Sequence, residues 1–449
     1  MKIHPGEEML KRLLRSMDAA DPRVLRHLSG CVRCRSRLVD SPRLYDPAPV
    51  VPFRPSRSGS YDAAFERSLS VVAHRIHLLE RERDEAPGLF AELMERTEEQ
   101  REILLRNSQR FRTWGLLELV VERSLERSIQ DAEIGEELGR LALRIADCLD
   151  DDCYGADQLE DLRARAWAYV GNARRIRSDL RGAEEAFRQA LTHLQRGTGD
   201  LFEQATLLDL QASLRRSQRR FDIALKLLRK AISLFLKIGD RHRAGRSLVN
   251  LSTVLLYAGR AGESIPVLHR ALELMAPAQE PRLLMIAKHN LIFVLTDLSR
   301  FLEAQRAYRE ARLLYRSFPD AWTQNRRKWV EGRIARGLGQ PEKAEALFLA
   351  ARDGFLEEGI PYDTALVSLE IALLYAGQGR TAELKRLAAE MVPIFASRQI
   401  HREALAALAF FQRAAEAERA GVTAVERIAE YLRKARYAPE LRFQERPGE

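Results

Sequence analysis

Three potential zinc ligands lie within eight residues near the start of the 449-residue chain. His27, Cys31 and Cys34 follow one another at His-x3-Cys-x2-Cys spacing. Gly30 suits the left-handed position that ends a helix. The two cysteines would then lie one turn apart at the start of the next helix, where the partial positive charge of the helix N-terminus favours their thiolate form. Tetrahedral zinc needs a fourth ligand, and His4 is the candidate. Four protein ligands leave no open position for water, which is the pattern of a structural rather than a catalytic site.

These four residues resemble the zinc-binding anti-sigma domain of bacteria. The resemblance covers about the first forty residues and implies a small helical module that binds zinc and holds an extracytoplasmic-function sigma factor away from RNA polymerase. The alternative is a structural zinc clip that only folds a segment too short to form its own core. Iron or cobalt would fit the same ligands.

The composition is that of an ordinary soluble protein, with 46% hydrophobic and 31% charged residues. Two of the four cysteines belong to the predicted zinc site, which argues against a disulfide framework and for a reducing compartment. Cys148 and Cys153 are expected to be buried or incidental thiols. The sequence shows neither a signal peptide nor a membrane-spanning segment, so we expect a cytoplasmic protein without a membrane partner.

The net charge of +9 is concentrated at the N-terminus. Residues 1–60 carry twelve Lys and Arg against six Asp and Glu, a surplus of six. A basic zinc module could bind nucleic acid through phosphate charge, and a nucleic-acid-binding regulator is therefore an alternative function. We do not favour it, because no recognition helix or aromatic platform accompanies the charge.

The chain divides into a zinc module, a linker and a long helical region. Residues 1–40 form the predicted module, and residues 41–60 read as a semi-rigid linker because they contain five prolines and lack apolar periodicity. Residues 61–157 are expected to form degenerate repeats or a capping bundle of four helices, at residues 63–81, 88–107, 112–129 and 132–149. Residues 438–449 form a tail.

Five copies of a small-x3-large-x2-small signature recur after residue 157. Their first residues are 41, 40, 40 and 40 positions apart, and weaker echoes continue the period to the C-terminus. Such a period indicates stacked helical hairpins. The five copies are Ala183/Phe187/Ala190, Ala224/Leu228/Ala231, Ser264/Leu268/Ala271, Ala304/Tyr308/Ala311 and Ala344/Phe348/Ala351.

The signatures resemble tetratricopeptide (TPR) repeats, in a variety of 40 rather than the usual 34 residues. The resemblance implies an all-α fold, a right-handed superhelical solenoid of antiparallel helix pairs, with about seven repeats over residues 158–437. It also implies a concave groove, lined by the first helix of each pair, that binds a protein or peptide. The proline that normally closes the repeat is missing from its expected place. A solenoid end without a polar cap can also dimerise, so a homo-oligomer is compatible with the sequence.

Asn250 and Asn290 occupy one equivalent first-helix position, 40 residues apart. Side-chain amides can bind the peptide units of an extended ligand, although local hydrogen bonds to a neighbouring repeat explain them equally well. The other predicted groove residues are basic, polar or aromatic, and packing between repeats is the alternative for the Trp and the His. They are Asn172, Arg175, Arg216, His289, Trp329 and Arg333.

The phosphate-binding, dinucleotide-binding, metalloprotease and nucleophile-elbow motifs of common enzymes do not occur. We therefore expect no enzyme. The favoured hypothesis is a bacterial regulatory adaptor whose TPR solenoid recruits a protein or peptide and whose zinc module binds a sigma factor. A general TPR scaffold with a structural zinc site is the alternative.

Overall fold

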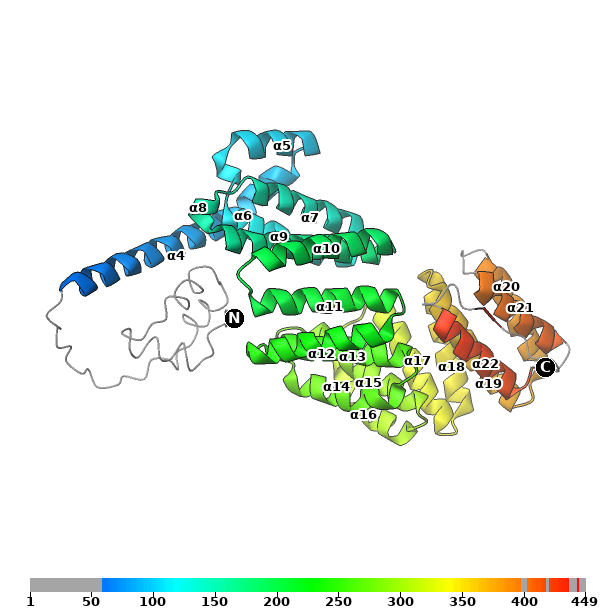
Figure 1. Cartoon of the computed structure of the whole chain (residues 1–449). Coiled ribbons are helices and arrows are strands. Elements are labelled where there is room, and N and C mark those ends of the chain that lie inside the picture. The colour runs from blue at the N-terminus through cyan, green and yellow to red at the C-terminus, as the bar shows by residue number, and fades with distance from the viewer. Residues whose placement is uncertain (1–58, 397–401, 417–419, 436–441, 444–449) are drawn as a thin grey trace, which may run out of the picture. The chain divides into compact units, whose positions relative to one another are not determined.

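The computed structural model describes residues 59–396, 402–416, 420–435 and 442–443. Throughout these ranges the regular structure is helical (Figure 1). The four predicted zinc ligands and the linker lie outside them. Within the described ranges, no helix combines the length and apolarity needed to span a bilayer. The helices are α4 (Gly59–Met94), α5 (Glu98–Asn107), η3 (Gln109–Phe111), α6 (Trp114–Gln130), α7 (Ala132–Asp147), α8 (Asp151–Tyr154), α9 (Ala156–Ile176), α10 (Leu180–Arg196), α11 (Leu201–Ser217), α12 (Phe221–Lys237), α13 (Arg241–Tyr257), α14 (Ala261–Leu274), α15 (Pro281–Asp297), α16 (Phe301–Arg316), α17 (Ala321–Gly337), α18 (Pro341–Glu357), α19 (Pro361–Gly377), α20 (Thr381–Ala396), α21 (Arg402–Glu416) and α22 (Val422–Ala435).

The chain forms two compact units that divide within α12. Unit 1 contains the chain up to residue 218 together with residues 226–240, and unit 2 contains residues 219–225 and everything from residue 241 onward. In unit 1, helices α4, α6, α7 and α9 pack in sequence around one apolar core. The two units are described separately below.

The first helices of unit 1 differ from the prediction. Instead of separate helices at 63–81 and 88–107, α4 runs without interruption through Pro87 and ends at Met94, and α5 begins after a capping box at Thr97. A proline inside a helix costs about 3 kcal/mol, but Leu89 and Leu93 beyond it are buried in the core, and their burial offsets the cost.

Helix pairs follow one another from α9 onward, and the repeat signature explains their packing. In the five signatures the small residues are at most 1% exposed, and Phe187, Leu228, Leu268 and Phe348 are also buried. Small side chains let paired helices approach closely, and the large one fills the space between them. Gly332 is another small residue at such a contact, because the absence of a Cβ lets its backbone lie directly against the Phe348 ring. The match to the predicted register supports a TPR-type solenoid.

The turn inside each helix pair from α9 to α20 contains a residue in the left-handed conformation. Gly259 has φ 73°, and the amides of Gly259 and Arg260 donate to Leu256 and Leu255 carbonyls at 3.0 and 2.8 Å. This is the Schellman arrangement that ends a helix. In these turns the left-handed residues lie 40 or 41 positions apart, and three of the six are not glycine: Ser178, Arg219 and Ser299.

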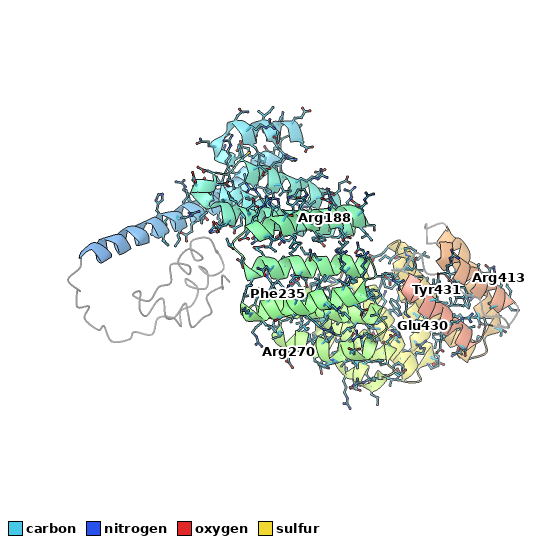
Figure 2. The ribbon with its side chains drawn as sticks, in the orientation of Figure 1. Arg188, Phe235, Arg270, Arg413, Glu430 and Tyr431 are labelled. Carbon is cyan, nitrogen blue, oxygen red and sulfur yellow. The ribbon has the colours of Figure 1, made fainter. Side chains whose placement is uncertain are left out.

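The last helices of unit 2 do not continue the solenoid pattern. Helix α21 packs on α20, while α22 returns to pack on α19 (Figure 1). Val425 and Ile428 of α22 are fully buried in the same core as Phe348, and the Tyr431 ring meets Phe443 edge-on with centroids 5.0 Å apart (Figure 2). Helices α19–α22 therefore close into a bundle that covers the apolar end of the stacked pairs.

Candidate functional site

The predicted groove of unit 1 is formed by neighbouring first helices. Asn172 and Arg175 lie on α9, and Arg216 lies at the equivalent repeat position of Arg175 on α11, which packs beside α9. The Asn172 amide is buried, and its Oδ1 accepts from Nε and Nη2 of Arg175 at 3.2 and 2.9 Å. Asn172 therefore positions the Arg175 guanidinium rather than presenting its own amide to the surface.

The guanidinium groups of Arg175 and Arg216 repel each other, and no carboxylate of the described residues pairs with either of them. Both guanidinium groups are half-buried, and burial together with the charge of Arg216 lowers the pKa of Arg175 to about 10. Within the described residues, neither Arg175 nor Arg216 has an ion pair with an Asp or Glu. A guanidinium pair of this kind favours an anionic group, which would reduce the repulsion and accept hydrogen bonds from both.

In unit 2, His289 is buried in an aromatic contact rather than open to a groove. Its Nδ1 lies 2.9 Å from the Tyr315 hydroxyl, and its Nε2 accepts from Nε of Arg326 at 3.2 Å. Burial and the charge of Arg326 hold the pKa of His289 well below its usual value, so the ring is neutral. An acceptor at Nε2 requires the proton to sit on Nδ1, which donates to Tyr315.

The two predicted ladder amides lie on adjacent first helices, Asn250 on α13 and Asn290 on α15. Both are half-buried. Asn250 already has a partner within the chain, and Asn290 lines a small cavity of about 30 Å³ beside Trp322 and Arg326. A cavity of this size holds about one water molecule.

Trp329 and Arg333 are also buried. Packing between repeats is the alternative given for Trp329, whereas the sequence predicts Arg333 as a groove residue. Trp329 meets the rings of Phe293 and Phe355 edge-on, with centroids 5.7 and 6.1 Å away. Arg333, which is 3% exposed, stacks its guanidinium over the Phe293 ring at 4.6 Å. The two side chains therefore pack between repeats and do not form open surface.

Arg333 belongs to a buried charge network that links four helices of unit 2. Its Nη2 donates to Asp297 of α15 at 2.9 Å, and its Nε lies 3.2 Å from Glu370 of α19. Arg336 pairs with Glu370 at 2.7 Å, and Arg433 of α22 lies 3.6 Å from Asp297. Burial opposes the charge of Glu370, but the charges of Arg333 and Arg336 prevail and lower its pKa.

Sequence reasoning did not identify this network. Arg336 occupies the repeat position of Arg175 and Arg216, eight residues before the signature's first small residue, and that equivalence was the available signal. Arg336 is paired with Glu370 from the first helix of the next repeat, and Asp297 from the first helix of the preceding repeat pairs with Arg333. The equivalent position thus carries paired charge in unit 2 and unpaired charge in unit 1.

The described residues contain no group of three or more His, Cys, Asp or Glu side chains that could hold a metal. Cys148 and Cys153 are free thiols, and burial raises the pKa of Cys153. The predicted ligands His4, His27, Cys31 and Cys34 lie outside the described ranges.

Comparison with known proteins supports the repeat assignment. Residues 202–276 match the Tetratricopeptide repeat family. No curated protein matches the chain by sequence. A Rap protein complexed with competence and sporulation factor is similar in structure, with a TM-score of 0.54 and 12% identity over 72% of this chain and 87% of that one.

Aspartyl phosphate phosphatase F from Bacillus subtilis is also similar, with a TM-score of 0.50 and 12% identity over 88% of this chain and 92% of that one. At these identities the likeness concerns the fold alone. Together with the family match, it supports a TPR protein, as the repeat signatures predict.

Proposed function

We propose that the chain is a regulatory adaptor that binds a protein or peptide on the first-helix face of its repeats, with an acidic group of the ligand held between Arg175 and Arg216. The observation that carries the proposal is the like-charged pair, which is half-buried and has no carboxylate partner in the described chain. The Rap protein of similar fold was crystallised with competence and sporulation factor, which is consistent with a ligand-binding role for such a fold.

The ligand would gain both charge and directed hydrogen bonds at this place. Asn172 holds two donors of Arg175, which fixes the plane of its guanidinium and leaves Nη1 to a ligand. A carboxylate between Arg175 and Arg216 would remove their mutual repulsion in a partly desolvated setting, where charged hydrogen bonds are strong. Independently of this place, the amides of Asn250 and Asn290 in unit 2 would bind peptide units of an extended segment.

The test is a pull-down from extract of the source cells with wild type and the Arg175→Glu/Arg216→Glu variant. A matched variant, Arg181→Glu/Arg188→Glu, reverses the same number of charges on exposed positions of α10 in the same unit. Arg188 is labelled in Figure 2. A partner that the matched variant retains and the Arg175/Arg216 variant loses supports the proposal. Equal retention by both folded variants refutes it, with circular dichroism as the check on folding.

We also propose that His4, His27, Cys31 and Cys34 bind zinc and that the module they form binds a sigma factor. The support is the His-x3-Cys-x2-Cys spacing and its resemblance to anti-sigma domains. The zinc would hold the segment in a fixed fold, and the solenoid would supply the input.

Zinc content and co-purifying proteins should be compared between wild type and Cys31→Ser/Cys34→Ser. About one zinc per chain and a sigma factor that only wild type retains would support both parts. Zinc in wild type with every partner surviving the substitutions would leave a structural clip. A salt-sensitive mobility shift that requires residues 1–60 would favour the nucleic-acid alternative.

A further inference from the structure

Unit 2 contains a basic cleft beside α17. The cleft has a volume of about 610 Å³, with α16 on one side, α17 as its floor and the start of α18 at its edge. Its lining residues are Gln305, Tyr308, Arg309, Arg312, Arg316, Gln324, Arg327, Glu331, Ile334, Ala335, Leu338, Gln340 and Lys343.

Helix geometry separates the cleft from the buried charge network. Successive residues of an α-helix are rotated by about 100°, so Arg327 and Glu331 point to the side of α17 opposite Trp329 and Arg333. The cleft therefore lies on another side of α17 than Trp329 and Arg333, between α16 and the start of α18.

The charge of the cleft is strongly unbalanced. Five cationic side chains line it, against a single carboxylate, Glu331, which gives a surplus of four positive charges. That carboxylate is already satisfied, because the Tyr308 hydroxyl donates to it at 2.6 Å and Arg327 Nη1 at 2.9 Å, while Lys343 Nζ lies 3.4 Å away. Glu331 is thus engaged by Tyr308, Arg327 and Lys343. It does not compensate the positive charge of the arginines that α16 contributes to the cleft.

The uncompensated charge forms a row along α16. Arg309 bonds only to the neutral Gln305 amide, at 3.2 Å, and Arg312 and Arg316 have no ion pair among the described residues. All three arginines are exposed. Arg309 and Arg316 are seven residues apart, so the row spans about 10 Å.

We propose that this cleft binds an acidic segment of a partner protein, with Asp or Glu side chains of the segment on Arg309, Arg312 and Arg316. An extended chain places alternate side chains about 7 Å apart, so two or three carboxylates would match the row. Tyr308 is the one aromatic residue in the lining, and its hydroxyl is engaged by Glu331 and Arg327. The cleft therefore offers little stacking surface for nucleic-acid bases, which favours a protein segment.

The direct test measures binding of a fluorescein-labelled synthetic peptide of alternating Glu and Ser by anisotropy, using the full chain. The cleft variant is Arg312→Glu/Arg316→Glu, whose side chains make no ion pair that the fold needs. The matched control is Arg270→Glu/Arg306→Glu, which reverses two exposed charges of the same unit that do not line the cleft. We expect the dissociation constant to rise at least about tenfold in the cleft variant and to change less than about twofold in the control.

Three results would overturn the proposal. They are the absence of measurable peptide binding by wild type, an equal loss in the cleft variant and the control, and a single-stranded oligonucleotide of equal charge that binds through Arg312 and Arg316 more tightly than the peptide. The Arg175→Glu/Arg216→Glu variant should keep full peptide affinity for the cleft. Failure of the first-helix-face proposal therefore leaves this one standing, and the reverse also holds.

Discussion

Replacement of Gly332 by alanine should destabilise the solenoid, although alanine is the better helix former. A Cβ at position 332 would lie 2.6 Å from Cε1 and 2.7 Å from Cδ1 of Phe348. Ordinary contact begins at 3.4 Å, so the ring would have to move by about 0.8 Å. Phe348 is completely buried, with neighbours on every side, and cannot move without displacing them.

The magnitude follows from two opposing contributions. Overpacking a close contact costs about 1–3 kcal/mol, whereas alanine gains about 1 kcal/mol over glycine inside a helix. We expect the free energy of unfolding to fall by up to about 2 kcal/mol, measured by urea unfolding followed by circular dichroism. Gly88 is the matched control, because it lies inside α4 with no atom within 4 Å of the added Cβ. Gly88→Ala should be stabilising, by up to about 1 kcal/mol.

A double-mutant cycle shows whether the Phe348 ring is the cause. Phe348→Leu alone should destabilise by leaving a cavity, but Leu would give Cβ332 room. Gly332→Ala/Phe348→Leu should therefore cost at least about 1 kcal/mol less than the sum of the single changes. Additive effects, or a gain for Gly332→Ala equal to that for Gly88→Ala, would refute the close-contact explanation of the repeat signature.

Three further perturbations test other parts of the molecule. Burial raises the pKa of Asp161 to about 7, and Glu203 and Asp200 add to the effect, so the folded carboxyl keeps its proton at pH values where the unfolded one has lost it. The free energy of unfolding should therefore fall between about pH 4 and pH 7, by at most about 1.4 kcal/mol per pH unit, and Asp161→Asn should flatten the pH series. Glu370→Leu leaves Arg333 and Arg336 without their shared carboxylate and should cost about 3–5 kcal/mol in the free energy of unfolding. Loss of Glu383 on α20, which forms a solvent-screened pair with Arg380, should cost far less, and equal losses in urea unfolding would contradict the buried network. Ser299 has φ 59°, so Ser299→Gly should raise the free energy of unfolding by up to about 1 kcal/mol, and a fall in the melting temperature would contradict the strain at this turn.

The repeat architecture was predictable from the sequence because its determinants are local and periodic. A small-x3-large-x2-small pattern specifies which side of a helix can be approached closely, and the same residues, such as Ala183 and Phe348, are buried in the structure. The zinc-site prediction also rests on local spacing, and it stays a prediction because its residues lie outside the described ranges.

What the sequence determined by itself was therefore the run of helix pairs and the side of each helix that packs. Tertiary structure decided which first-helix charges are compensated: within the described ranges Arg175 and Arg216 have no ion pair, while Arg333 receives Asp297 and Glu370 from neighbouring repeats. It also decided that α22 packs on α19 and that side chains of α16, α17 and the start of α18 line one cleft. The physical reason is that ion pairing and the packing of α22 on α19 depend on residues that are tens of positions apart in the sequence. A local pattern does not encode which of these residues meet in space.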